Sequence, residues 1–270
     1  GAALLGMVMG LAVKALRTHR QRRAYTPLDP LDLCTGGAST RLAMATVSGA
    51  GEEVTTQSLR GRLLEMAARA DRGQTENPQD NTQIKEIIDK LELAMIGQGT
   101  TARLDGKWEL VWASEDVTRS SPFFWAFRQA YPDNADQVYA ITDSIPGQLK
   151  EIGRAVQNIS GAEGPGEGSL ESRVVIRALP GTPLPLESVM ITTSAIVDRN
   201  RSQVTLKVDE TKVRETTLPL WDKTLPFPSG VALELARQGA SEVVMTTLYI
   251  DELIRISKND QGQTFVWTRI

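Results

Sequence analysis

Hydrophobic and polar residues alternate most clearly in one short stretch in the first half of the chain. Trp108, Leu110 and Trp112 fall on one side of an extended segment, whereas Lys107 and Glu109 fall on the other. Two tryptophans on one face form a large apolar surface that must be buried. The pattern therefore predicts a strand that has one face in a core.

The second half of the chain predicts a series of mostly short strands. Runs rich in β-branched and aromatic residues are separated by polar segments at 198–201 and 258–262 that are typical of hairpin turns. Many antiparallel strands with one apolar face each favour a barrel or a strongly curved sheet, which closes its own edges. The predicted strands lie at 156–159, 173–178, 188–197, 203–208, 242–250, 253–257 and 264–270.

Helical spacing of apolar residues predicts two helices before the first strand. The first begins at Thr55 or Thr56, either of which can act as its N-cap. The second opens at Pro78 and ends at Gly97. We expect this pair to cover one end of the sheet domain. Shorter helices are predicted at 122–131, 134–142 and 231–237.

The N-terminal segment differs from the rest of the chain. Residues 1–13 carry no charge, and a basic run follows them. This apolar run is shorter than the roughly 20 residues that span a bilayer. Three interpretations stay open: a targeting leader, a helix in a membrane or on a partner, and a helix packed on its own domain. The chain is thus predicted to comprise an apolar and basic helix at 1–23, a linker at 24–55 and a domain at 56–270.

Composition excludes several classes of function. A formal net charge of −3 argues against general attraction to nucleic acid. One cysteine cannot form an internal disulfide, and the single histidine, His19, lies outside the predicted sheet domain. A Ser-His-acid triad and a Cys/His metal site are therefore not expected. We predict no catalytic residue and no metal ligand, which leaves carboxylate-only chemistry as the one enzymatic alternative.

Three stretches carry a resemblance to a known family. They are the motif from Leu104 to Trp112, the preceding helix pair with Asn77-Pro78, and the closing motif from Tyr249 to Ser257, which Phe265-Val266 follows. From about residue 59 onward the chain resembles the plastid lipid-associated proteins, also called plastid fibrillins or plastoglobulins. The resemblance implies a lipocalin-like barrel in plastids, associated with thylakoids or plastoglobules, that holds small apolar molecules or coats lipid.

The expected fold is mainly β with helices (α+β), a lipocalin-like antiparallel barrel preceded by a helix pair and an N-terminal apolar helix. Aromatic side chains near the two ends of the sheet either line a cavity or fill a closed core. Asp251 and Arg255 would share one face of a strand, where they either orient a ligand or form a structural ion pair or hydrogen-bonded turn. The candidate ligand-binding residues are Trp108, Leu110, Trp112, Phe265, Trp267, Asp251 and Arg255.

The expected function is that of a non-enzymatic lipid-associated protein. Its ligand would be a lipid, quinone, carotenoid or chlorophyll, and its partners thylakoid or plastoglobule lipids or a photosynthetic membrane complex. The alternative is a structural subunit with a filled barrel. An aromatic segment between the first two strands either contacts membrane or is buried over the barrel end. The candidate membrane or partner contacts are Leu4, Leu5, Gly6, Gly10, Leu11, Phe123, Phe124 and Trp125.

Overall fold

The computed structural model describes residues 49–73, 78–97, 100, 103–143, 150–163, 166–178, 186–217 and 227–270. The predicted apolar helix at 1–23 lies outside these residues, as does most of the predicted linker at 24–55. The expectations for Leu4, Leu5, Gly6, Gly10 and Leu11 therefore stay predictions.

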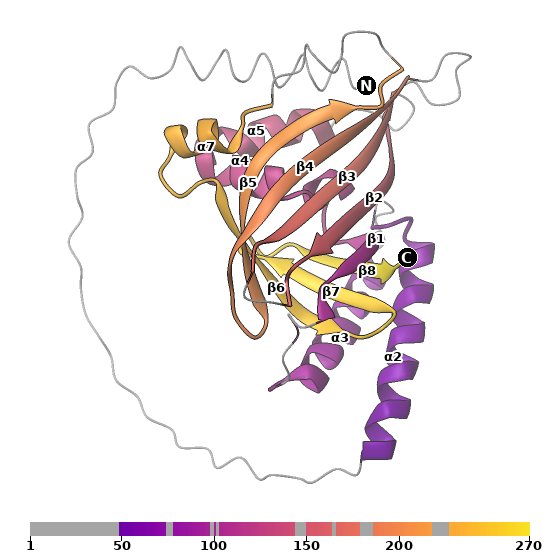
Figure 1. The fold of residues 1–270 in the computed structure, drawn as a ribbon. Helices are drawn as coiled ribbons and strands as arrows, with labels where there is room; N and C mark the ends of the chain where they lie inside the picture. Colours follow the sequence, from indigo (N-terminus) through magenta and orange to yellow (C-terminus); the bar gives the residue numbers. More distant parts are fainter. Residues whose placement is uncertain are drawn as a thin grey trace, which may run out of the picture.

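Eight strands of the described residues form a closed antiparallel barrel (Figure 1). Each strand pairs with the next one along the chain, and the last pairs with the first. The predicted class, mainly β with helices, is confirmed. The strands are β1 (Gly106–Ala113), β2 (Lys150–Ser160), β3 (Gly168–Ala178), β4 (Leu186–Arg199), β5 (Gln203–Arg214), β6 (Glu242–Ile250), β7 (Ile254–Asn259) and β8 (Thr264–Arg269).

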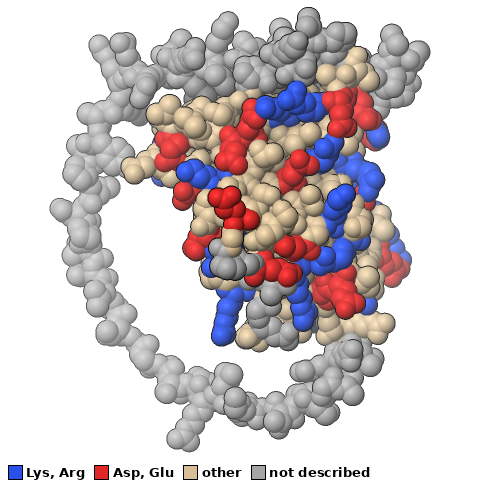
Figure 2. All heavy atoms as spheres, in the orientation of Figure 1, with Lys and Arg blue, Asp and Glu red and all other residues tan. Residues whose placement is uncertain are grey.

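The strands β2 to β5 are longer than the hydrophobic pattern predicts. Their additional residues include charged side chains that point outward and pair across strands. Glu151 of β2 and Glu187 of β4, for example, lie outside the predicted strands and contact Arg177 of β3 at 2.9 Å and 2.7 Å. Figure 2 shows basic and acidic side chains mixed over this outer face. Charged residues that read as turn signals in the sequence therefore continue the strands, because their partners lie on neighbouring strands.

The helices α2 (Gly49–Arg69) and α3 (Pro78–Met95) pack against each other, and they contact β1 and β6. Outward-facing residues of β7 and β8, such as Ile256 and Val266, are also fully buried. The helix pair thus covers a side of the barrel. The helix α2 begins at Gly49, six residues before the predicted cap at Thr55.

The chain that follows α2 fastens the barrel between β1 and β2. The paired register of these strands ends at Glu109, and Arg72 forms a parallel bridge to Trp112 beyond that point. The guanidinium of Arg72 also donates to the backbone carbonyls of Ile152, at 2.7 Å, and Gly153. The neighbouring Gly73 has φ of +84°, and a Cβ there would lie 2.1 Å from a backbone carbonyl oxygen of β1. This close approach requires glycine.

One end of the barrel is closed by a tryptophan under an arginine. Trp108 is 0% exposed, and its Nε1 donates to the Leu104 carbonyl at 2.8 Å. The guanidinium of Arg269 lies 4.1 Å from the centre of the Trp108 ring and donates to the carbonyls of Asp105 and Arg103. These contacts join β8 to the start of β1. The predicted burial of Trp108 on a face shared with the last strand is confirmed.

We expect Trp108→Ala to lower the free energy of unfolding by about 3–5 kcal/mol, because a fully buried indole is replaced by a cavity. Urea unfolding followed by circular dichroism measures the change. The control is Val197→Ala, at a half-exposed position on β4, which should stay within about 0.5 kcal/mol of the parent. A loss at Trp108 no larger than that of the control would show that this residue does not hold the barrel closed.

Candidate functional site: the barrel interior

One side of the barrel interior is polar. Register pairs place Gln157 of β2 opposite Ser172 of β3, Ser172 opposite Thr192 of β4, and Thr192 opposite Thr211 of β5. All four residues are buried. We call this row the polar belt. Thr247 of β6 and Ser257 of β7 form a further polar pair, because they face each other and are buried.

The opposite side of the interior is aromatic. Phe265 and Trp267 project from β8, next to Trp108 of β1, and all three are 0% exposed. The Trp267 Nε1 donates to the Ser257 hydroxyl at 2.9 Å, and Phe265 stacks on Trp125 with ring centres 5.7 Å apart. The interior therefore offers an aromatic surface facing a surface of hydroxyl and amide groups.

A helical segment of the chain itself enters the other end of the barrel. It consists of the 3-10 helix η2 (Val117–Ser120) and the helix α4 (Pro122–Ala130), and we call it the plug. The Ser121 hydroxyl donates to the hydroxyl of Thr192 at 2.9 Å, and the Gln157 amide donates to the Ser120 carbonyl at 3.0 Å. The plug thus reaches the polar belt.

The aromatic residues of the plug are buried rather than exposed. Phe123, Phe124 and Trp125 are 0%, 3% and 1% exposed. The interpretation of these residues as membrane contacts is therefore corrected, and the alternative, burial over the barrel end, describes them. The reason is that α4 is apolar on nearly all sides, so it is covered by the barrel on one side and by α5 (Pro132–Asp143) on another.

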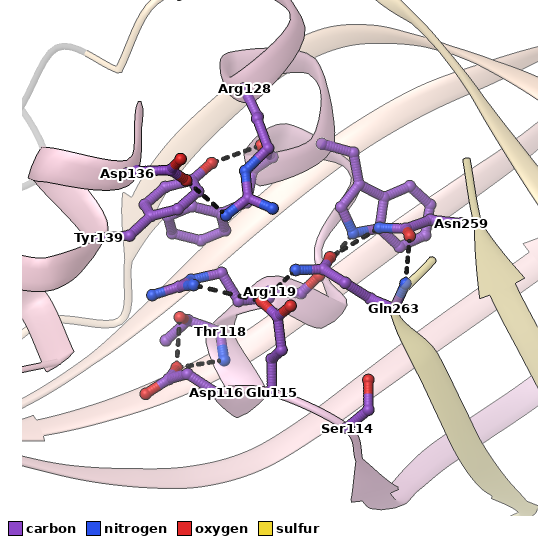
Figure 3. Close-up of polar contacts among 12 residues, drawn as sticks. Ser114, Glu115, Asp116, Thr118, Arg119, Arg128, Asp136, Tyr139, Asn259 and Gln263 are labelled. Atoms are coloured by element: carbon purple, nitrogen blue, oxygen red, sulfur yellow. Dashed lines mark hydrogen bonds and ion pairs between the residues drawn. The ribbon is translucent and has the colours of Figure 1, made fainter. Parts of the chain in front are cut away.

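A cluster of charged and polar side chains fastens the plug (Figure 3). The guanidinium groups of Arg119 and Arg128 lie 4.1 Å and 4.9 Å from the centre of the Tyr139 ring, and the Tyr139 hydroxyl donates to the Phe124 carbonyl at 2.6 Å. Burial raises the pKa of Tyr139, against the opposing effect of the two arginines. Arg128 is also paired with Asp136 at 3.0 Å. These mutual contacts hold α5 on α4, which indicates that the cluster has a structural role.

The carboxylate of Asp116, at the edge of this cluster, also has hydrogen-bond and ion-pair partners. Asp116 accepts from the backbone N–H and the hydroxyl of Thr118, at 2.9 Å and 2.5 Å, and it lies 3.4 Å from the Lys150 ammonium. Burial acts to raise the pKa of Asp116, but the charge of Lys150 and the hydrogen bonds from Thr118 outweigh it and leave the pKa lowered. Asp116 therefore caps the plug.

Arg255 lies in the interior beside Trp108 and Trp267, and it is 0% exposed. Its guanidinium is 4.8 Å from the centre of the Trp267 ring and 5.2 Å from that of Trp108. Its Nη2 donates to Gln157 Oε1 at 2.6 Å. Burial, and secondarily the charge of Arg269, lowers the pKa of Arg255 to about 9. A buried arginine thus connects the aromatic side of the interior to the polar belt.

Residues 57–268 match the family model PAP_fibrillin. The chain belongs to the PAP/fibrillin family. A search of curated proteins gives no match. The family is one of plastid lipid-associated proteins that are generally non-enzymatic.

In this fibrillin domain, Asp251 and Arg255 do not pair with each other. Asp251 lies in the turn before β7, so the expectation that both share one strand face is wrong. Its carboxylate instead accepts from Arg60 of α2 at 2.8 Å and from the Tyr249 hydroxyl at 2.9 Å. It also accepts from the backbone N–H groups of the turn. Asp251 therefore ties α2 to the turn, as the alternative interpretation, a hydrogen-bonded turn, predicts for this residue.

The candidate ligand-binding residues of β1 and β8 meet in the core of the fibrillin domain. Trp108, Leu110, Trp112, Phe265 and Trp267 are each at most 2% exposed. Their role in binding a ligand stays a prediction. Sequence reasoning missed the polar belt, although one signal was present. Ser172 falls in phase with Leu170, Val174 and Ile176, which marks it as an inward-facing polar residue.

The outer face of the fibrillin domain carries a hollow of about 450 Å³ over β1 to β4. Valines and Ile270 line it, and Arg154 and Arg173 stand at it. Each of these arginines is paired with a glutamate, Arg154 with Glu109 at 2.6 Å and Arg173 with Glu215. The paired charges give this hollow no evident preference for a charged ligand.

None of the helices in the described ranges combines the length and the apolar character needed to cross a bilayer.

We expect the contribution of Asp251 to stability to depend on pH. Burial acts to raise its pKa, but the hydrogen bonds from Ile254 N–H, Arg60, Leu253 N–H and Tyr249 leave the pKa lowered. A carboxyl with a lowered folded-state pKa stabilises above its unfolded pKa of about 3.9, and this stability is lost as pH falls through the folded pKa. Asp251→Asn should therefore destabilise the protein at neutral pH and much less near pH 3.

Urea unfolding of the parent and of Asp251→Asn at both pH values tests this expectation. The matched control is Glu252→Gln, which changes the exposed neighbouring carboxylate. An equal difference between the parent and Asp251→Asn at both pH values would contradict the expectation.

Proposed function

We propose that this chain is a non-enzymatic plastid protein that holds one small, mainly apolar molecule inside its barrel. The observation that supports this function most is a set of buried polar atoms in the core that have no hydrogen-bond partner among the described residues. They are Trp112 Nε1, Ser120 Oγ, Ser194 Oγ, Thr247 Oγ1 and Arg255 Nε. Buried polar atoms in native proteins are nearly always paired, so several orphans together indicate a guest or bound water that completes the pairing.

The chemistry of the interior favours an amphiphilic guest. The aromatic side suits an extended apolar body, and the polar belt with Arg255 suits one polar end. Lipids, quinones, carotenoids and chlorophylls share this composition. Among the described residues, the buried polar side chains include no Asp, Glu, His or Cys. The interior therefore favours binding over acid–base or nucleophilic catalysis.

A second candidate function is that of a structural subunit. The plug supports it, because Ser120 and Ser121 already bond to the polar belt and the plug aromatics occupy one end of the interior. An eight-stranded barrel is just wide enough to be filled by its own side chains or to hold one small ligand. The two candidates therefore differ in whether a guest is present.

We also propose that the protein is attached to thylakoid or plastoglobule lipid, or to a photosynthetic membrane complex, through its N-terminal segment. The support is the uncharged run at 1–13 with small residues at Ala2, Gly6 and Gly10, a pattern that suits close packing of helices in lipid. Basic residues that follow the run suit lipid headgroups.

The first test is extraction of the bound molecule. The full chain, produced in plastids and purified without detergent, should release about one apolar molecule per chain into organic solvent, as measured by mass spectrometry. Bovine serum albumin added to the same lysate and re-purified measures nonspecific carry-over. Release of nothing in stoichiometric amount would favour the structural subunit.

The second test concerns attachment. Gly6→Arg with Gly10→Arg should release the full chain from isolated thylakoids and plastoglobules, because each charge at the centre of a membrane helix costs roughly 2.5–3.5 kcal/mol. The control, Gly36→Arg with Gly37→Arg, adds the same charges outside the apolar run. Fractionation with high salt and then detergent distinguishes the forms. If both double variants stay bound like the parent, the segment is not the anchor.

A further inference from the structure

We infer that the guest carries a carboxylate, and that Arg255 is the residue that binds it. This inference rests on the proposed function and names the chemical class of the ligand: an apolar chain or ring system that ends in one carboxylic acid. The inference distinguishes such acids from neutral lipids, quinones and pigments. The proposed function alone does not make this distinction.

The first argument is the unused hydrogen-bonding capacity of Arg255. A guanidinium has five N–H donors. Among the described residues, Nη2 donates to Gln157 Oε1 at 2.6 Å, Nη1 is 4.0 Å from the sulfur of Met245, and Nε has no partner. Sulfur is a weak acceptor, so one oxygen serves the whole group. A carboxylate supplies two oxygens in the plane of the guanidinium, which matches the donors that are left.

The second argument is the missing negative charge. No Asp or Glu of the described residues forms an ion pair with Arg255, although arginines on the outer face such as Arg177 have two. Besides burial, the positive charge of Arg269 acts on Arg255 and lowers its pKa. The rings of Trp108 and Trp267 compensate for part of the cost of burying the cation. A buried charge is usually paired, and here an anionic guest is the partner that the described residues do not provide.

The third argument is orientation. Trp108 and Arg269 close the barrel at the start of β1, and Arg255 lies beside Trp108, near this closed end. The carboxylate of the guest would therefore lie at this closed end. The apolar part would then lie along Trp267 and Phe265, toward the plug. Gln157 connects the two regions, because it accepts from Arg255 and donates to the Ser120 carbonyl.

The test compares an acid with its own methyl ester. The probes are cis-parinaric acid and methyl cis-parinarate, which share one fluorescent chain and differ only in charge. Energy transfer from the protein's tryptophans to the chain reports binding at the interior. The full-length parent should bind the acid roughly tenfold or more tightly than the ester, as expected for charge-assisted hydrogen bonds.

Arg255→Met should remove this preference, because the acid loses its cationic partner and then binds no more tightly than the ester. Replacing a buried charge by an apolar side chain of similar size is often tolerated, so this variant is expected to fold. Arg255→Lys keeps the charge and should retain part of the preference, and it serves in place of the methionine variant if that variant does not fold. The matched control is Arg154→Gln, which removes one arginine from the outer face and should bind as the parent does.

The outcomes separate this inference from the function on which it rests. If the parent binds both probes equally, or if Arg255→Met keeps the preference for the acid, the carboxylate assignment is overturned and an apolar-ligand function stands. If neither probe binds and extraction also releases nothing, the proposed function fails together with the inference.

Discussion

An eight-stranded barrel encloses an interior only wide enough for its own side chains or one small ligand, and the filling of that interior constrains the rest of this protein. The two ends are closed by different means. At one end Trp108 lies under Arg269, and at the other the plug hydrogen-bonds to the polar belt. Between them is Arg255, a fully buried cation that has aromatic neighbours and one amide partner. The energetics of the interior therefore depend on how this charge is compensated.

The elements outside the barrel follow from the same closure. The strands β1 and β2 part above Glu109, and Arg72 bridges the opening with its backbone and its guanidinium. Asp251, in the turn before β7, holds α2 through its ion pair with Arg60. The helix α2 and the residues that follow it thus stabilise the barrel where β1 and β2 separate and at the turn before β7, which gives a physical reason for helices preceding the sheet in this fibrillin domain.

The sequence predicts much of this fold, because β1 and the first half of β5 alternate clearly and the two leading helices have clear apolar stripes. Prediction fails where long-range contacts decide the outcome. Charged residues such as Glu151 and Glu187 fall outside the predicted strands, yet their ion pairs with Arg177 on the neighbouring strand β3 keep them in the sheet. The four-residue spacing of Asp251 and Arg255 predicts one shared strand face, but backbone hydrogen bonds place Asp251 in a turn.

In the candidate site, too, some features could be predicted from the sequence and others could not. The aromatic residues could be predicted because their apolar phase is visible in the sequence. The polar belt could be found only from the phase of single residues such as Ser172. The isolation of Arg255 from every carboxylate of the described residues could not be predicted, because the sequence places Asp251 four residues away. A residue's partners are set by the three-dimensional register rather than by its spacing.

The most direct test of this account is an NMR measurement of the arginine side chains in the full-length protein. Arginine Nε–H signals in a ¹⁵N–¹H spectrum should include one that is protected from solvent exchange and absent in Arg255→Lys. We predict that this signal shifts when cis-parinaric acid is added and stays in place when its methyl ester is added. A signal that neither molecule moves, or that both move alike, would contradict the claim that Arg255 is the anion-binding group of the barrel.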